Sequence, residues 1–270
     1  MVRAFRQSRL TVIGVFTASV VLTGLVWVRD RDLPVQIPLV ASVLLLLLGV
    51  FLGRLVGNLV ADGCNTKLLG LLHVDLDPEA FLAGYAGVPG RLKPDSRDYV
   101  VASAYLADGY AAKGDFDGAI AALCPPGQAG LGENAALLGL YLQSLCGYRL
   151  GRGDREEGAQ ALAQLEEVAA GCAGKQDKLA ENLTETAAVL RARLACLEGR
   201  SIDRPFLEKQ AQQAPYKLRR LDALQLLAQD ALRRRRRREA VSLLERLRDE
   251  GGKTWYAAWA AEQLRACMEE

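Results

Sequence analysis

Two long uncharged apolar stretches stand near the start of the chain. They read LTVIGVFTASVVLTGLVWV over residues 10–28 and VQIPLVASVLLLLLGVFLG over residues 35–53, and each is nineteen residues long. A helix needs roughly 20 apolar residues to cross about 30 Å of hydrocarbon. Only the short segment 29–34 separates the stretches. The pattern therefore predicts that residues 10–60 hold two transmembrane helices, about 10–28 and 35–53, joined by a short loop.

A secretory signal peptide is the alternative interpretation of the first stretch, because Arg3, Arg6 and Arg9 form a basic segment before it. Signal peptides carry an apolar region of roughly 7–15 residues and a small-residue cleavage site. The stretch here is longer, lacks an A-x-A-like site, and is followed at once by a second one. These features favour the helical hairpin.

The distribution of arginine predicts the orientation of the hairpin. Residues 1–9 hold three arginines and no acid, whereas the connecting loop holds Arg29 and Arg31. The more basic flank stays in the cytoplasm, so we expect residues 1–9 to be a basic cytoplasmic N-terminus. Two crossings return the C-terminal domain to the same side. Six scattered cysteines without paired spacing fit a reducing compartment. We therefore expect an integral protein of the cytoplasmic (inner) membrane.

Three glycines recur at every fourth position at the end of the second stretch, namely Gly49, Gly53 and Gly57. This spacing places them on one helical face, where small residues allow a second helix to approach closely. Packing within the hairpin is the favoured interpretation. A homo-oligomer formed through the second helix is the alternative.

Residues 61–98 are predicted to be a juxtamembrane linker. Asp77-Pro78-Glu79 is typical of a helix start, with a capping residue, a proline in the first turn and an early acid. We therefore expect a short helix from about residue 77. The single histidine, His73, has no partner at metal-ligand spacing, so we interpret it as a packing residue.

From residue 99 the pattern is helical and repetitive. A helix pair over 102–123 turns at Gly114-Asp115, and a second over 137–165 turns at Gly153-Asp154. Weaker pairs follow, one with a turn at 199–201 and one over 221–247. A last helix over 255–268 is predicted to cap the array. Trp255 and Trp259 should form its inner face, with an aromatic binding site as the alternative.

These residues resemble a tetratricopeptide repeat (TPR) over about residues 99–250. The resemblance is carried in the first pair by Leu106, Tyr110, Gly114 and Ala119, in the second by Leu145 and Gly153, and in the fourth by Leu227 and Ala240. Arg235 stands where the family has its glycine. The resemblance implies that residues 99–270 form an all-α, TPR-like α-solenoid of stacked helix pairs whose first helices line a concave groove. Alignment on the turns gives the groove candidates Asp108, Gln143, Asp222, Gln225, Gln229 and Arg233.

The charge pattern changes at residue 60. Residues 1–60 hold six arginines and two aspartates, a net charge of +4, whereas the remaining 210 residues hold 28 basic and 30 acidic side chains, a net charge of −2. A nucleic-acid-binding domain needs a basic footprint, so the balance argues against nucleic acid as a partner.

Six consecutive arginines are the most unusual feature of this part of the chain: Arg233, Arg234, Arg235, Arg236, Arg237 and Arg238. The repeat alignment places them at the turn between paired helices. A solvated turn, in which cations stabilise a helix C-terminus, is the first interpretation. Contact with anionic lipid headgroups is the second. An acidic protein segment or nucleic acid is the third.

The sequence holds no familiar catalytic constellation. It contains no phosphate-binding G-x-x-x-x-G-K-[ST] motif, no H-E-x-x-H, no G-x-S-x-G and no C-x-x-C. We therefore expect no catalytic residues, no metal site and no cofactor. The leading hypothesis is a membrane-anchored, non-enzymatic scaffold that binds a peptide or protein partner at the cytoplasmic membrane face. The alternative is a membrane-organising structural protein that self-associates through the glycine face and binds anionic lipid through the arginines.

Overall fold

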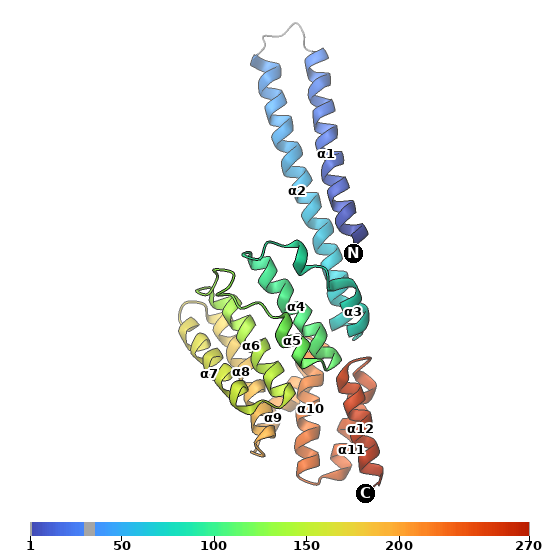
Figure 1. Cartoon of the computed structure of the whole chain (residues 1–270), viewed down its shortest axis with the longest axis vertical. Helices are drawn as coiled ribbons and strands as arrows, with labels where there is room; N and C mark the ends of the chain where they lie inside the picture. Colours follow the sequence, from blue (N-terminus) through green and yellow to red (C-terminus); the bar gives the residue numbers. More distant parts are fainter. Residues whose placement is uncertain (1, 30–35, 270) are drawn as a thin grey trace. The chain divides into compact units, whose positions relative to one another are not determined.

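The computed structural model describes residues 2–29 and 36–269, and only the backbone at residues 2–11, 26, 29, 36–38, 54, 56–62 and 64. The described chain is helical and contains no strand, which confirms the predicted all-α class (Figure 1). It divides into two compact units, Met1–Leu69 and Gly70–Glu270.

The first unit is an antiparallel pair of helices, α1 (Val2–Arg29) and α2 (Gln36–His73). Their contacts run in opposite directions along the two helices. The indole of Trp27 donates a 2.9 Å hydrogen bond to Ser42 Oγ, and further along Gly49 lies against Ser19. Helix α2 continues to His73, past residue 61 where the linker was predicted to begin. No proline or glycine cap stops the helix there.

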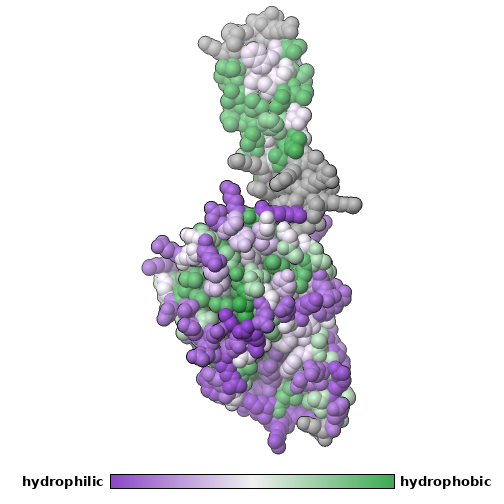
Figure 2. All heavy atoms as spheres, viewed as in Figure 1, coloured by the Kyte–Doolittle hydropathy of each residue, from purple (hydrophilic) through white to green (hydrophobic). Residues whose placement is uncertain are grey.

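The surface of the first unit is apolar. Large hydrophobic side chains are exposed along both helices from Val12 to Leu55, and Figure 2 shows this surface as mostly hydrophobic. Within the described residues, no helix meets the combined length and hydropathy of a membrane span.

The second unit contains α3 (Pro78–Tyr85), a short 3-10 helix η1 (Pro89–Arg91), α4 (Arg97–Lys113), α5 (Phe116–Ala122), α6 (Ala135–Arg152), α7 (Arg155–Cys172), α8 (Asp177–Leu197), α9 (Arg204–Gln213), α10 (Lys217–Arg233), α11 (Arg237–Glu250) and α12 (Trp255–Glu269). Local chemistry fixes several of the starts. Side chains of Asp77, Ser96, Asp115, Asn134 and Asp203 accept hydrogen bonds from the first turns of their helices. The predicted short helix from residue 77 is thus present.

Most of the second unit is a stack of helix pairs. Helices α4 and α5, α6 and α7, and α10 and α11 pack as pairs, and the second helix of each pair also packs against the next first helix (Figure 1). The third pair departs from this pattern, because α9 lies mainly against α10 instead of α8. Neighbouring first helices α4, α6, α8 and α10 contact one another in order. The arrangement is compatible with an α-solenoid.

The turns between paired helices share one backbone feature. A left-handed residue stands at the C-cap of the first helix or directly after it: Gly114 (φ 90°), Gly153 (φ 94°), Gly199 (φ 73°) and Arg235 (φ 56°). A left-handed residue at this position closes a helix C-terminus, and glycine adopts it without steric cost. The predicted turns at Gly114 and Gly153 are confirmed, and Arg235 adopts the glycine-like conformation despite its side chain.

The last helix returns to the start of the second unit. The ring of Trp255 on α12 meets the ring of Phe116 on α5 edge-on, with centroids 5.5 Å apart. The backbone N–H of Lys253 donates a 3.0 Å hydrogen bond to the carbonyl of Leu76, and Lys253 Nζ lies 2.5 Å from Asp77. Helix α12 therefore both caps the last pair and reaches the first one.

Candidate functional site

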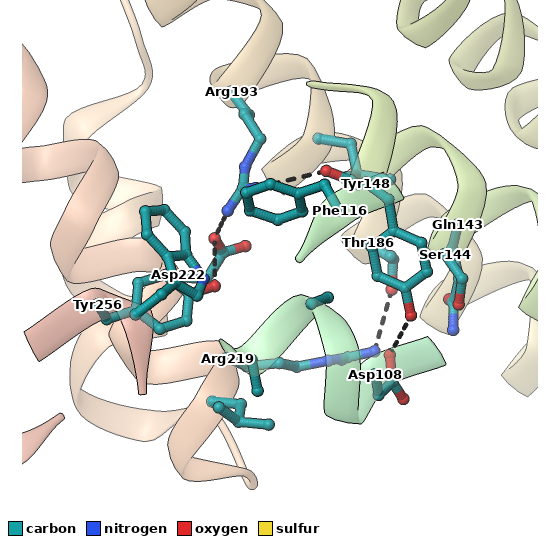
Figure 3. A pocket seen from close by; sticks show the side chains of 16 residues that line it. Asp108, Phe116, Gln143, Ser144, Tyr148, Thr186, Arg193, Arg219, Asp222 and Tyr256 are labelled. Atoms are coloured by element: carbon teal, nitrogen blue, oxygen red, sulfur yellow. Dashed lines mark hydrogen bonds and ion pairs between the residues drawn. The ribbon is translucent and has the colours of Figure 1, made fainter. Parts of the chain in front are cut away.

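The first helices of the pairs surround a cavity of about 210 Å³ in the second unit (Figure 3). Helices α4, α6, α8 and α10 each contribute side chains, and α12 adds its first turn. The polar and charged side chains that line it are Asp108, Gln143, Ser144, Tyr148, Thr186, Arg193, Arg219, Asp222 and Tyr256. The surface that the repeat resemblance predicts to be concave is thus the surface that holds the cavity.

Asp108 of α4 is held by a tyrosine from the next first helix. Tyr148 Oη donates a 2.5 Å hydrogen bond to Asp108 Oδ1. Burial raises the pKa of Asp108 to about 6, although the hydrogen bond from Tyr148 and the positive charge of Arg219 both oppose the increase. Burial also raises the pKa of Tyr148 well above its ordinary value, so the phenol remains a donor at neutral pH.

An ion pair lies between α8 and α10. The guanidinium of Arg193 contacts the carboxylate of Asp222, and the same carboxylate accepts a 3.2 Å hydrogen bond from Tyr256 Oη (Figure 3). Arg193 is only 8% exposed, and its Nε–H has no hydrogen-bond partner among the described residues. The ion pair and the tyrosine thus connect α8, α10 and the capping helix α12 at one point.

A second arginine, Arg219 of α10, has no carboxylate partner among the residues that the structure describes. Its Nη2 donates a 3.2 Å hydrogen bond to Thr186 Oγ1 on α8. Figure 3 shows its guanidinium directed along the cavity towards Thr186. Phe116 and Trp255 supply part of the apolar lining. The site thus combines aromatic surface with two aspartates and two arginines.

Three of the six predicted groove residues line this cavity, namely Asp108, Gln143 and Asp222. Gln225 is buried in the helix stack with its Oε1 unpaired, Gln229 is half-buried, and Arg233 contacts Asp230. The last three do not line the cavity, because α11 and α12 pack along the C-terminal half of α10. Only the first turns of α10 remain open to it.

Tyr148, Arg193 and Arg219 were not among the predicted groove residues. Arg193 lies six residues before the left-handed Gly199, the same spacing as Asp108 before Gly114. Aligning the third helix pair on Gly199 would therefore have identified Arg193 as a groove residue. Tyr148 and Arg219 have no such signal, since their roles depend on how α6 and α10 pack against helices distant in sequence.

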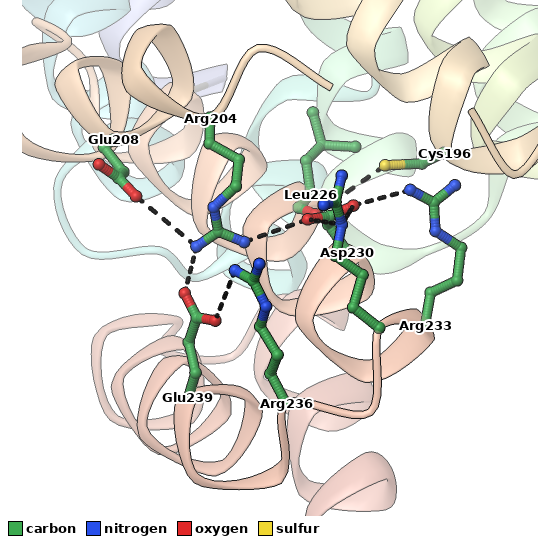
Figure 4. A network of polar contacts seen from close by, with 9 residues as sticks. Cys196, Arg204, Glu208, Leu226, Asp230, Arg233, Arg236 and Glu239 are labelled. Carbon is green, nitrogen blue, oxygen red and sulfur yellow. Dashed lines mark hydrogen bonds and ion pairs between the residues drawn. The ribbon is translucent and has the colours of Figure 1, made fainter. Parts of the chain in front are cut away.

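The arginine run forms the turn between α10 and α11, as the alignment predicts. Much of it surrounds a buried acid (Figure 4). The Asp230 side chain is fully buried, and its oxygens lie 2.8 Å from Arg233, 3.0 Å from Arg234 and 3.1 Å from Arg204 of α9. Arg204 also contacts Glu239 and, at 3.6 Å, Glu208. The network ties α9, α10 and α11 together.

The arginines control the ionisation of Asp230. Burial alone would raise its pKa, but hydrogen bonds from Arg234, Arg204 and Arg233 outweigh that effect and hold the pKa below its ordinary value. Of the other arginines in the run, Arg236 pairs with Glu239 and Arg237 donates to the carbonyl of Cys267. Within the described chain, Arg235 and Arg238 are exposed and have no partner.

Two of the three predicted packing glycines lie against α1. A Cβ at Gly49 would overlap Ser19, and a Cβ at Gly53 would lie 3.5 Å from Val12. The surroundings of Gly57 lie outside the described residues. His73 packs near Tyr216, with ring centroids 5.8 Å apart.

The described cysteines are all free thiols, and burial raises the pKa of Cys146 to about 12 and of Cys196 to about 11. Among the side chains that the structure describes, no group of His, Cys, Asp and Glu is arranged to hold a metal ion.

No protein-family model matches the chain, and neither the curated proteins nor the solved structures contain a significant match.

Proposed function

We propose that this protein is a membrane-anchored, non-enzymatic scaffold whose TPR-like domain binds a peptide or protein partner in the cavity lined by α4, α6, α8, α10 and α12. The observation that carries the proposal is the convergence of the first helices and the cap on one concave site. Repeat domains share a shape and not a ligand, so the chemistry of the lining must define the partner.

The surface of the hairpin supports a membrane anchor. Among the described side chains of α1 and α2, nineteen large apolar ones are exposed between Val12 and Leu55. Fully burying one such side chain is worth roughly 1.5–3 kcal/mol, so a lipid surround would stabilise this unit by far more than any single contact. The predicted spans 10–28 and 35–53 include residues 10–11 and 35–38, whose side chains lie outside the described set.

The hydroxyl groups within the hairpin are hydrogen-bonded in a way that is compatible with a hydrocarbon environment. Thr17, Ser19 and Thr23 each donate a hydrogen bond to the backbone carbonyl four residues earlier. A hydroxyl without a partner is costly in lipid, and this pattern satisfies it within the helix. With the arginine-rich N-terminus, the proposed location is the cytoplasmic membrane, with both ends of the chain in the cytoplasm.

The alternative function has less support from the geometry. Gly49 and Gly53 are occupied by α1 in the hairpin, which favours intramolecular packing over a homo-oligomer. Four arginines of the run have partners within the chain, which leaves Arg235 and Arg238 as the arginines of the run without a described partner that could contact anionic lipid.

Two experiments test the proposal. Reporter fusions after Glu270, one active only outside the membrane and one only inside, should show activity inside alone. For the cavity, Arg219→Gln should reduce partner co-purification with the full chain, whereas the exposed Arg238→Gln should not. Reporter activity outside would reject the orientation, and equal recovery with both variants would reject the cavity as the partner site.

A further inference from the structure

The four charged side chains of the cavity are not equally compensated. Arg193 and Asp222 form an ion pair with each other. Asp108 and Arg219 face the cavity from α4 and α10, and the charge of Arg219 lowers the pKa of Asp108 without a direct contact between them. Among the described residues, neither side chain forms an ion pair. Each has one neutral partner, the hydroxyl of Tyr148 or of Thr186. The cavity therefore presents one negative and one positive group with unused hydrogen-bonding capacity.

This arrangement selects for a particular ligand chemistry. A partly desolvated charge with a single neutral hydrogen bond gains from an opposite charge in the ligand. A purely anionic ligand would satisfy Arg219 but leave Asp108 beside a like charge, and a purely cationic ligand would do the reverse. We infer that the cavity takes a bipolar segment of the partner, with its anionic group against Arg219 and its cationic group against Asp108. This inference rests on the proposed function.

Further hydrogen-bonding groups of the site fit the backbone of such a segment. The amide of Gln143 has no partner among the described residues, so it can both donate to and accept from a peptide bond. The buried Nε–H of Arg193 is one further unpaired donor. Phe116 and Trp255 offer apolar surface for the aliphatic stems of long charged side chains.

The closure of the array limits the length of the segment. Trp255 contacts Phe116 and lies over Gly114, so α12 bounds the cavity at the side of the first pair. A cavity of about 210 Å³ with this boundary fits two neighbouring side chains better than a long extended peptide. The recognised element is therefore compact, such as adjacent lysine and glutamate side chains.

Four blocked dipeptides of equal size test the inference by titration calorimetry against the full chain in a non-ionic detergent. The probes are N-acetyl-Lys-Glu-amide, N-acetyl-Lys-Gln-amide, N-acetyl-Gln-Glu-amide and N-acetyl-Gln-Gln-amide. The bipolar Lys-Glu probe should bind about tenfold more tightly than either singly charged probe, because it satisfies both charges of the cavity. Equal affinities, tighter binding of a singly charged probe, or no binding of any probe would overturn the inference.

Variants assign the two halves of the bipolar site. Asp108→Asn keeps an acceptor for Tyr148 and should remove the advantage that a lysine gives, whereas Arg219→Gln should remove the advantage that a glutamate gives. Asp98→Asn on α4 and Arg238→Gln on α11 are exposed controls and should change neither. Circular dichroism checks that each variant is folded. Partner cross-linking at Gln143 that persists while all four probes fail would refute the bipolar ligand and retain the proposed function.

Discussion

Trp255 lies directly over Gly114: a Cβ added to the glycine would be 3.1 Å from the Cβ of the tryptophan. The contact joins the first turn of the capping helix to the turn of the first helix pair, which are distant in sequence. Gly153 occupies the equivalent turn of the second pair, and a Cβ there would meet nothing within 4 Å. The closed shape of the array therefore depends on Gly114 in a way that does not apply to Gly153.

Alanine substitutions at these two glycines should separate backbone strain from closure. Both positions have a left-handed φ, so alanine should cost about 1 kcal/mol at Gly153. At Gly114 the displaced Trp255 should add about 1–2 kcal/mol more. Urea unfolding of the full chain, followed by circular dichroism, measures both. Equal losses at the two positions would contradict the role of Gly114 in closure.

Arg235 offers a stabilising substitution at the fourth turn. Its φ of 56° is unfavourable for a residue with a Cβ by roughly 1–2 kcal/mol, whereas glycine adds an entropic cost of about 0.5–1 kcal/mol. Arg235→Gly should therefore raise the free energy of unfolding by about 0.5 kcal/mol. Arg238→Gln, on the same exposed surface, should leave it unchanged. A loss of stability in Arg235→Gly would show that the arginine side chain is needed for folding.

The turns were predictable because their determinants are local. A glycine that ends one helix and an aspartate at the N-cap position of the next are adjacent in sequence at 114–115 and 153–154, and the side chain of Asp115 makes the capping hydrogen bond. Only three of the nine polar and charged side chains that line the cavity were predicted from the sequence. Asp108 lies six residues before its turn at Gly114, whereas Asp222 lies thirteen residues before Arg235. The positions that face the cavity therefore differ from one first helix to the next, so an alignment at constant spacing fails for Gln225 and Gln229.

The return of α12 to the first pair could not be predicted, because it depends on contacts between residues far apart in sequence. Trp255 was expected on the inner face of the cap, and it does face the cavity. Trp259 packs against the core formed with α10 and α11, as expected for the inner face of the cap. The same long-range packing determines which of Asp108, Arg219 and Tyr148 share the site.

At neutral pH, the ionised Asp108 should lower the free energy of unfolding. Its pKa of about 6 lies above the ordinary carboxyl value, so the folded chain holds this proton more tightly than the unfolded chain. The stability that the protonated Asp108 carboxyl gives is fully present below about pH 4 and is lost as pH rises through 6. Asp108→Asn should therefore gain about 1 kcal/mol at pH 7.5 relative to the wild type, and little at pH 4.

Urea unfolding of wild type and Asp108→Asn between pH 4 and 7.5 checks this sign. The ionisable groups near Asp108 are Tyr85, Tyr105, Tyr148, Arg219 and Tyr256. None of these has an ordinary pKa in the tested range, so the difference between the two pH profiles reports Asp108. A variant that loses stability at every pH would indicate a purely structural aspartate.

Asp230 should behave in the opposite way. Removing the buried carboxylate by Asp230→Ala leaves Arg204, Arg233 and Arg234 without their shared acceptor, which should cost about 3–5 kcal/mol. Because its pKa is lowered, the contribution is present above the ordinary value near 4 and is lost as pH falls below it.

The exposed pair of Asp249 and Arg248 is the matched control for this network. Asp249→Ala should cost less than about 1 kcal/mol, because a solvent-exposed ion pair contributes little. Thermal unfolding of both variants at neutral pH measures the contrast. Similar small losses for both variants would mean that water can replace the Asp230 carboxylate as the partner of the surrounding arginines.

Site-specific photo-cross-linking in cells tests the central claim most directly. A photo-reactive residue would replace Gln143 in the cavity, Gln229 at the covered end of α10, or the exposed Glu167 on α7. We predict a discrete adduct from position 143 that is absent from positions 229 and 167 and is lost when Arg219→Gln is added. Equal cross-linking from positions 143 and 167, or an adduct from position 143 that Arg219→Gln leaves unchanged, would contradict a partner site in the cavity.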